Sequence, residues 1–490
     1  MEGTKASNDA LAAANPLARL SAVELLAGYK ARSFTPRDVL EDVIGALEDV
    51  DAACRVMVTP MFEQARAKAD AASASWRSGD PGGALCGVPV TVKDLVFVQG
   101  VPALGGAPVN SNFVPNADAA VVAALRAAGA ILTCKTTTCE SGYKLTADSP
   151  VSGITRNPWN LRRTSGGSSG GAAAAMAAGC GPLAIGTDGV GSIRVPSSFC
   201  GVFGLKPTFG LVPRSPGFSP PSWASLAHTG PITRTVADAA LLLEVIAGYD
   251  PRDAASLPLQ MRPFSVPPRD LEGIRIAASA DLGYAAVSPS IRRAFSEAVD
   301  ILAGLGAEIR YSHPGLDPKL LERTLKPIAF TEQAAAVAGK SEADLARSDV
   351  EYRRVIAQGR KYSGVDYIEA TYRRATVRAA FQAMFQNVDA LVTPTVAVTA
   401  FEAGALGVDR IDGTAVDPHL GWSPFSWPIN LAGLPAATLP CGFDADGLPI
   451  GLQIIAPWLD EATIFRIAGV FETAKPWAEI WPPARPAVQS

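Results

Sequence analysis

Two clusters of glycine and serine carry the residue types that acyl-transfer chemistry needs. The first reads TSGGSSGG, Thr164–Gly171, and the second reads GTDGVGS, Gly186–Ser192. A serine hydroxyl attacks a carbonyl group efficiently when a base takes its proton and N–H donors stabilise the oxyanion that forms. Small residues in a turn let successive backbone N–H groups point at one spot. The second cluster, which ends at Ser192, therefore predicts a nest for a developing oxyanion.

The first cluster fits one known glycine pattern and fails two others. A phosphate-binding loop would end in Gly-Lys-Ser or Gly-Lys-Thr, whereas this run ends in Gly-Gly-Ala. A dinucleotide fingerprint directly follows a strand, and 162–164 has poor strand character. The run does match G-x-S-x-G with Ser168 at its centre, which is the pattern of a nucleophile elbow. A His-dependent α/β-hydrolase esterase that uses Ser168 is therefore one hypothesis.

The base that would activate a serine is a separate question, because histidine is scarce. The chain has three histidines, His228, His313 and His419, and the esterase hypothesis needs one of them. His419, in VDPHLGWSP, could be placed for this role. Lys93, at the end of the apolar run VPVTVKD, is the other candidate. Burial lowers the pKa of a lysine, so a buried Lys93 could accept a proton, whereas a solvated lysine at a strand end could not.

Asp188 and Arg194 flank the second cluster with opposite charges. We interpret them as a structural ion pair that fixes the turn. The second hypothesis then combines an amine base, a serine relay and a serine nucleophile at the glycine-rich turn.

The elements that must position these residues follow a β-α-β order. We expect a buried strand within Gly87–Val96, a helix from about Asp118 to Gly129, and a strand near 130–134. Alternation of strands and helices favours an α/β sheet. Later strands are expected within 274–280, 307–312, 389–398, 436–443 and 450–457, and a helix within 290–306.

No internal repeat divides the chain, so we expect a single domain over 1–490. Its N-terminal part, 1–80, is expected to be helical, and the chemical motifs fall within 81–250. The region 316–424 is expected to add helices and a long loop that covers the site, because loops of that length are usually functional.

Composition excludes several classes of protein. The 490 residues are 48% apolar and 18% charged with a net charge of -4, which suits a large core and offers no basic surface for nucleic acid. We expect no signal peptide and no membrane helix. The seven cysteines are odd in number and scattered, which favours a reducing, cytoplasmic location. Cys134 and Cys139 lie close together without further ligands nearby, so no metal site is expected.

Several long motifs, in the same order, resemble those of the amidase signature family. They are GVPVTVKD, TRNPWN, GGSSGG, GTDGVGSIRVPSSFCGVFGLKPTFG and GPITRTVADAA from about Gly87 to Ala240, then FSWPINLAGLPAATLPCGF and GLPIGLQIIAP. The resemblance implies an α/β fold: a single α/β/α unit with a large mixed β-sheet between helical layers.

The resemblance also implies a Ser–cis-Ser–Lys triad. The nucleophile falls on Ser192, the bridging serine on Ser168 and the base on Lys93. The peptide bond between Gly167 and Ser168 is expected to be cis. No metal and no organic cofactor is implied.

The oxyanion hole implied by the resemblance consists of the backbone N–H groups of Gly189, Val190, Gly191 and Ser192. The family usually has glycine where Val190 stands. A β-branched residue resists positive φ, so Val190 is expected to narrow the site or to reshape the turn.

The activity implied is hydrolysis of the C–N bond of a small carboxylic-acid amide, including an aryl amide or a carbamate. Gly167 and Tyr143 are the expected substrate contacts. Trp422, Phe425 and Trp427 would suit an aryl group, and core packing explains them at least as well. We expect a small-molecule amide as the partner, no nucleic acid, no membrane, and a homodimer.

Three other hypotheses stay open. One is the glutaminase-type subunit of a transfer-RNA-dependent amidotransferase, which has SLDQIGPITR where this chain has SLAHTGPITR, Ser225–Arg234. The second is the His-dependent esterase that uses Ser168. The third is a binding protein that has lost activity.

Overall fold

A mixed β-sheet is the centre of the molecule. The computed structural model describes residues 16–218, 225–259 and 270–483. Within them eleven strands form one sheet in the order β1-β3-β2-β8-β10-β9-β16-β17-β13-β11-β12. The strands are β1 Met57–Pro60, β2 Pro89–Lys93, β3 Ile131–Thr136, β8 Leu183–Asp188, β9 Phe203–Lys206, β10 His228–Thr233, β11 Arg275–Ala278, β12 Glu308–Tyr311, β13 Ala390–Pro394, β16 Ala436–Phe443 and β17 Pro449–Ile455.

The strands that carry the predicted chemistry are parallel neighbours. β2 pairs in parallel with β3 on one side and with β8 on the other. All three are buried along nearly their whole length, as parallel strands covered on both faces are. Their carboxyl ends therefore meet at one edge of the sheet, where Lys93 ends β2 and Asp188 ends β8.

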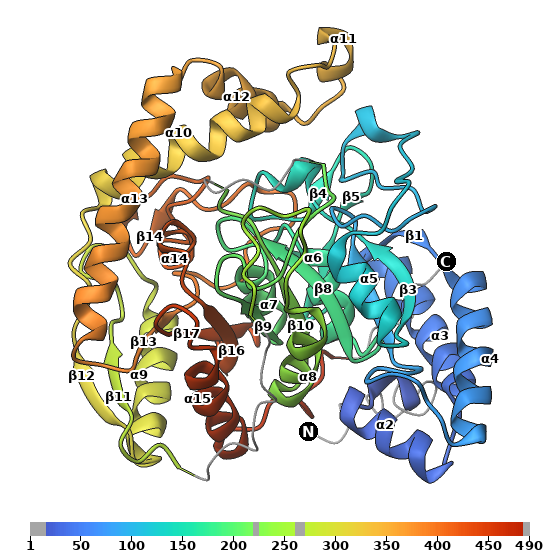
Figure 1. Ribbon diagram of the computed structural model, residues 1–490. Coiled ribbons are helices and arrows are strands. Elements are labelled where there is room, and N and C mark those ends of the chain that lie inside the picture. The colour runs from blue at the N-terminus through green and yellow to red at the C-terminus, as the bar shows by residue number, and fades with distance from the viewer. Residues whose placement is uncertain (1–15, 219–224, 260–269, 484–490) are drawn as a thin grey trace.

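Helices cover both faces of the sheet (Figure 1). One layer contains α3 Pro36–Cys54, α4 Phe62–Ser78, α6 Gly170–Ala177 and α7 Arg194–Cys200, and the other contains α5 Ala120–Ala127, α8 Val236–Ile246, α9 Pro289–Gly304 and α15 Glu461–Ala474. The fold class predicted from the sequence is confirmed. The expected β-α-β unit is β2, α5 and β3, and each expected later strand is present.

The N-terminal helices begin at clear capping residues. α2 Ala22–Ala31 starts after Ser21, and the hydroxyl of Ser21 and the carboxylate of Glu24 satisfy each other's backbone N–H groups. Thr35 and Asp38 do the same at the start of α3. The first fifteen residues of the predicted helical part, on which the expectation about a signal peptide rests, lie outside the described residues.

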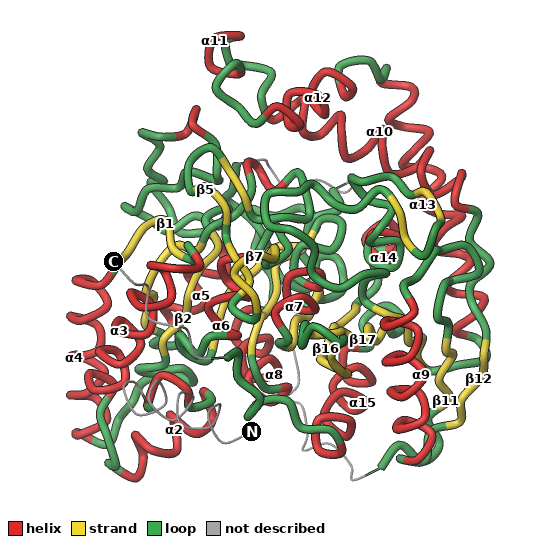
Figure 2. The backbone as a smooth tube through the Cα atoms, turned by 180° about the vertical axis from the view of Figure 1, so that it is seen from behind, coloured by secondary structure: helices red, strands yellow, loops and turns green. Residues whose placement is uncertain are grey.

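A helical arm extends beyond the carboxyl-terminal edge of the sheet, in the orange and yellow part of the chain (Figure 1), and the view from behind shows it again (Figure 2). It consists of α10 Pro318–Ala336, α11 Glu342–Leu345, α12 Val350–Gly359 and α13 Gly364–Phe385, followed by the hairpin β14 Arg410–Ile411 and β15 Thr414–Ala415 and by α14 Trp427–Ala432. These elements fill most of the region that the sequence indicated as an addition over the site.

One local prediction was wrong. Residues 162–164 form the end of a strand, β7 Asn160–Thr164, which pairs with β6 Arg156–Asn157. This ribbon stands apart from the main sheet, as does the pair β4 Asp148–Ser149 and β5 Gly153–Ile154. Pairing with β6, which the local sequence does not reveal, outweighs the weak strand propensity.

Candidate active site

Lys93 lies at the carboxyl end of β2, where hydroxyl groups surround its amine. The side chain is fully buried, with 0% exposure. Its Nζ is 2.8 Å from Ser168 Oγ, 2.9 Å from Ser169 Oγ and 2.8 Å from Thr187 Oγ1. No carboxylate among the described residues forms a salt bridge with Lys93. The structure therefore places a buried amine against three neutral hydroxyls.

Burial lowers the pKa of the Lys93 amine to about 7, against a smaller opposing influence from Cys139 and Asp188. The physical cause is that a buried ammonium loses its hydration, and neutral hydroxyls replace only part of it. A large share of Lys93 is then an uncharged amine at neutral pH. Such an amine carries a lone pair that can accept a proton from a neighbouring hydroxyl.

Ser168 lies in the turn that joins β7 to α6, and it is 1% exposed. The peptide bond between Gly167 and Ser168 is cis, as the family resemblance implied. A Cβ atom at position 167 would lie 2.1 Å from the carbonyl oxygen of Thr146, so this turn has room only for glycine. The N–H of Ser169 donates to the carbonyl oxygen of Ser192 at 3.1 Å. This bond connects the two glycine-serine clusters.

Ser192 lies in the tight turn between β8 and α7 and is 2% exposed. Gly191 takes the positive φ of this turn, at 133°, and a Cβ there would lie 2.6 Å from Ser426 Oγ. Val190 has no positive φ. The backbone thus accommodates a β-branched residue at 190, because glycine occupies the position that needs the unusual conformation.

The four backbone N–H groups predicted for the oxyanion hole are not equivalent. The N–H of Gly191 donates to Asp188 Oδ1 at 2.8 Å and is therefore occupied. For the N–H groups of Gly189, Val190 and Ser192 the described part of the chain supplies no partner. We therefore remove Gly191 from the predicted set and keep the other three as candidate donors.

Asp188 and Arg194 form the expected ion pair, and both side chains are fully buried. The guanidinium donates from Nε to Oδ2 and from Nη2 to Oδ1, both at 3.0 Å. Burial by itself would raise the pKa of Asp188, but Arg194 outweighs it and holds the pKa well below its usual range. Nη1 of Arg194 also donates to Gln453 Oε1 at 2.7 Å and to the carbonyl oxygen of Ser426 at 2.9 Å. The pair thus fixes the serine turn to α14 and β17.

A cavity of about 740 Å³ opens in front of the two serines. Ser168, Ser192, Gly189, Val190 and Tyr143 all line it. Lys93 lies behind Ser168 and does not reach the lining.

Only one of the two predicted substrate contacts lines the cavity. Tyr143 faces the cavity, whereas Gly167 is absent from the lining and packs against Thr146. Of the two explanations for Trp422, Phe425 and Trp427, core packing holds, because all three are buried in the core and do not line the cavity. Side-chain packing among distant segments, which no local pattern reveals, decides these positions.

Three other aromatic side chains form one wall of the cavity. Phe97, Phe113 and Phe218 contact one another with ring centroids 4.9 to 5.7 Å apart. The spacing is typical of packed aromatic rings.

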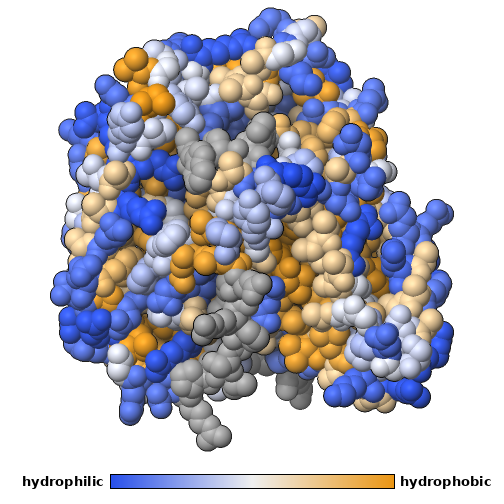
Figure 3. All heavy atoms as spheres, viewed as in Figure 1, coloured by the Kyte–Doolittle hydropathy of each residue, from blue (hydrophilic) through white to orange (hydrophobic). Residues whose placement is uncertain are grey.

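The outer surface of the molecule is shown in Figure 3. In this view hydrophilic side chains border the left edge, and hydrophobic ones gather right of the centre.

Comparison with known proteins identifies the family. The family model described as Amidase matches residues 38–465. An acylamidase from Rhodococcus erythropolis is 34% identical over 94% of this chain and 96% of its own length. A glutamyl-tRNA(Gln) amidotransferase subunit from Cyanothece sp. is 35% identical over 91% of this chain and 96% of its own length. The chain belongs to the amidase family. It is thus a hydrolase that acts on amide C–N bonds.

A solved structure of an amidase resembles this fold along nearly the whole chain. A bacterial aryl acylamidase of the amidase signature enzymes superposes with a TM-score of 0.90, at 29% identity, over 96% of this chain and 100% of its own.

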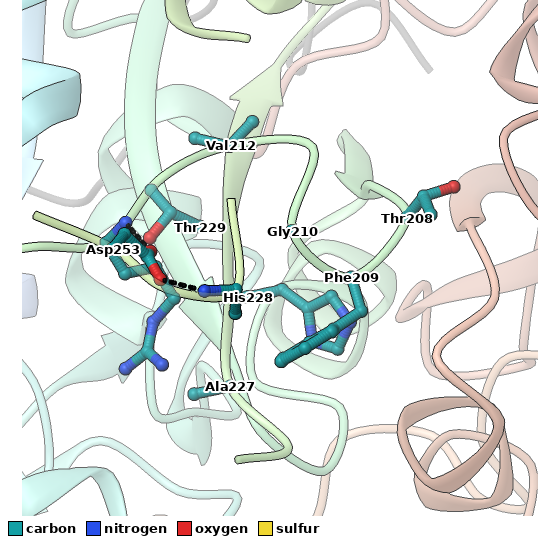
Figure 4. Close-up of a pocket in the computed structure, with 10 residues that line it drawn as sticks. Thr208, Phe209, Gly210, Val212, Ala227, His228, Thr229 and Asp253 are labelled. Carbon is teal, nitrogen blue, oxygen red and sulfur yellow. Dashed lines mark hydrogen bonds between the residues drawn. The ribbon is translucent and has the colours of Figure 1, made fainter. Parts of the chain in front are cut away.

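Neither serine of this amidase has a histidine partner among the described residues. His419 lines the cavity, but its ring lies against Phe330, with centroids 6.1 Å apart, and edge-on to Tyr143. His228 directs Nδ1 at the carbonyl oxygens of Leu226 and Asp188 and packs edge-on against Phe209. It lines a second, small cavity that shares Arg214 with the large one (Figure 4). His313 lies beside Gly283. The His-dependent arrangement is thus not formed.

Sequence reasoning missed two residues of the candidate site. Ser169 and Thr187 each lie within hydrogen-bond distance of Lys93 Nζ. The signal for Ser169 was its place beside Ser168 in GGSSGG, and the signal for Thr187 was its place before Asp188 in GTDG. Neither signal could be used without the parallel pairing of β2 with β8, which brings Thr187 to Lys93.

Proposed function

We propose that this protein is an amidase that hydrolyses a small carboxylic-acid amide through an acyl-enzyme on Ser192. Ser168 is the proton bridge and Lys93 the base. The observation that carries the proposal is the fully buried Lys93 amine, 2.8 Å from Ser168 Oγ and without a carboxylate partner among the described residues. An amine in that setting is suited to accept a proton.

Acylation begins at the amide carbonyl carbon. Ser192 Oγ forms the new C–O bond while its proton passes to Ser168 Oγ and the Ser168 proton passes to the Lys93 amine. The carbonyl oxygen becomes an oxyanion, for which the N–H groups of Gly189, Val190 and Ser192 are the available donors. Preorganised donors of this kind lower the barrier because they need no reorientation as the charge develops.

The intermediate then releases the amine. The C–N bond breaks, and the leaving nitrogen takes a proton that returns from Lys93 through Ser168. Water attacks the acyl-enzyme along the same route, passing a proton to Lys93, and Ser192 regains its proton as the carboxylic acid leaves. The balance of the reaction is one amide and one water in, and one acid and one amine out.

Substitution of the three side chains tests the proposal. Ser192→Ala is expected to lower turnover of an anilide to background, because no acyl-enzyme can form, and to abolish labelling by a fluorophosphonate. Ser168→Ala and Lys93→Ala should each lower kcat by about two orders of magnitude or more, the scale of a lost general base. His419→Ala is the control and should retain most of kcat.

Opposite outcomes identify the other hypotheses. Near wild-type turnover by Ser192→Ala would refute the mechanism. If Ser168→Ala and His419→Ala alone removed activity, the esterase hypothesis would replace it. A protein that turned over no amide and took up no fluorophosphonate would be a binding relative.

A second candidate function rests on the curated relatives. Amidotransferase subunits from several cyanobacteria are 33 to 35% identical to this chain, close to the value for the acylamidase. The glutaminase role predicts release of ammonia from glutamine and stable assembly with partner proteins. In this chain Ala227 and His228 replace the acidic and polar residues of that subunit's motif. Hydrolysis of an anilide without glutaminase activity would decide for the amidase.

A further inference from the structure

Arg214 is a cation in the cavity of the proposed serine nucleophile, and it has no ion pair within the described ranges. It follows β9 in the chain and lines the cavity that Ser168 and Ser192 also line. Its backbone N–H donates to Asp253 Oδ2 at 2.7 Å, which fixes the loop. Its guanidinium makes one hydrogen bond to the described part of the chain, from Nη1 to Ser225 Oγ at 3.2 Å, and no salt bridge. A guanidinium has five N–H groups, so most of them remain available.

Three buried cations elsewhere in this chain are satisfied by the protein. Arg194 is paired bidentately with Asp188, and Lys135 lies 3.1 Å from Asp94. Arg234 donates to the carbonyl oxygens of Trp477, Ala478 and Ile480. Arg214 is partly buried, and leaving a partly buried charge without such partners costs free energy. Arg214 therefore has the donors of a ligand-binding residue.

Each of the two carboxylates near Arg214 accepts a hydrogen bond from another residue. Asp253 accepts the N–H groups of Arg214 and Ala255 with its two oxygens, and the dashed lines at Asp253 in Figure 4 mark these bonds. Glu332, on α10, also lines the cavity and accepts the Tyr367 hydroxyl at 3.3 Å. Burial lowers the pKa of the Arg214 guanidinium, and both acids oppose this in part by favouring its charged form. Neither forms a salt bridge with it.

We propose that Arg214, together with the hydroxyl of Ser225, binds a carboxylate carried by the substrate. The amides hydrolysed would then bear an additional carboxyl group, on the acyl or the amine part. A planar guanidinium with free N–H groups matches the two oxygens of a carboxylate. A phosphate dianion fits less well, because one guanidinium cannot balance two charges near Glu332. The inference rests on the proposed function, since it places Arg214 in the cavity that holds Ser192.

A matched pair of substrates tests the inference. The mono-4-nitroanilide of glutaric acid carries a carboxylate where pentanoic acid 4-nitroanilide carries a methyl group. Wild-type kcat/KM is expected to be higher for the acid. Arg214→Gln should lower kcat/KM for the acid roughly 10- to 100-fold, the scale of a hydrogen bond to a charged group, and should change it little for the neutral anilide. Arg214→Lys should retain part of the preference.

Two further variants sharpen the comparison. Glu332→Gln removes a negative charge from the cavity and should raise kcat/KM for the acid, opposite in sign to Arg214→Gln. Arg323→Gln, at an exposed position of α10, changes net charge by the same amount as Arg214→Gln and should leave the ratio of the two substrates unchanged. Equal losses on both substrates in Arg214→Gln would mean a structural role and would overturn the inference, as would an absent preference in the wild type.

Binding of glutarate, measured by calorimetry, keeps this test separate from the mechanism. If no amide is turned over, the proposed function fails, but glutarate should still bind wild type more tightly than Arg214→Gln. If glutarate binds both proteins equally, or binds neither, the inference about Arg214 fails even where anilide hydrolysis proceeds.

Discussion

At the scale of single residues, the proposed chemistry of this protein depends on where one lysine is buried. If its strand were exposed, Lys93 would be an ordinary charged side chain. Here it has three hydroxyl partners, from Ser168, Ser169 and Thr187. None of them is charged, so none restores the ammonium form that burial disfavours.

The pH dependence of turnover should report the protonation of Lys93. The proposed mechanism needs the neutral amine, and burial lowers its pKa to about 7. As pH rises through that value the active fraction increases, so kcat/KM should rise about tenfold per unit at acid pH and become level above the pKa. An anilide whose own groups do not titrate in this range gives the measurement.

A matched variant separates Lys93 from other titrating groups. His419→Ala removes the cavity histidine and should leave the midpoint of the profile in place. A profile that is flat between about pH 5.5 and about pH 8, or that falls as pH rises, would contradict a lysine base with this pKa.

At the scale of elements, the helical arm is fastened to the catalytic core by buried polar contacts. Lys144 Nζ lies 2.6 Å from Asp148 Oδ2 of the core and 2.8 Å from Asp349 Oδ2 at the start of α12. Glu140 accepts the hydroxyl of Ser348 and the N–H of Asp349, both at 2.7 Å. These contacts come from the segment that also contains the cavity residue Tyr143, so the arm and the cavity wall are coupled.

Replacement of Lys144 should loosen the arm. Lys144→Met leaves the carboxylates of Asp148 and Asp349 facing each other without a cation, at an expected cost of about 3 kcal/mol. We expect faster proteolysis within 318–359 and a higher KM, because α10 supplies part of the cavity lining. Limited proteolysis followed by mass spectrometry measures the first effect.

Lys361→Met is the control for this prediction. Lys361 is exposed between α12 and α13, and its amine has no partner among the described residues. The helical arm of the Lys361→Met variant should be cleaved at the wild-type rate. Equal protection of the arm in Lys144→Met and in wild type would show that apolar packing, and not the polar contacts, holds the arm.

At the scale of the whole molecule, the seven cysteines belong to the core. All seven are buried and none forms a disulfide. Burial raises the pKa of several of these thiols, including Cys134 and Cys441, each to about 12. Both access and thiolate formation are therefore suppressed in the folded protein.

No helix of the described residues is long and apolar enough to cross a membrane.

Thiol labelling should therefore follow global unfolding. A disulfide reagent at neutral pH is expected to react slowly with the native protein. In denaturant it should react with all seven thiols. Absorbance of the released thiolate, followed through a denaturation curve, measures this. Rapid labelling of one cysteine under native conditions would show a local opening below the global free energy of unfolding.

The sequence predicted the α/β class, because strands and helices carry local periodicities that survive without tertiary context. Long ordered motifs also indicated the family, which the comparisons confirmed. The roles of Lys93, Ser168 and Ser192 were expected from the same motifs and stay predictions. The structure brings Lys93 and Ser168 into contact.

Tertiary structure alone decided what surrounds those residues. Gly191 lost its predicted place because Asp188 takes its N–H, and Trp422 proved to be core while Phe97 and Phe218 form the aromatic wall. The residues next to Arg214 in the sequence do not reveal whether its guanidinium has an ion-pair partner. Whether an N–H, a ring or a cation faces the cavity depends on partners far away in the chain, because packing and hydrogen bonding are settled only when the segments meet.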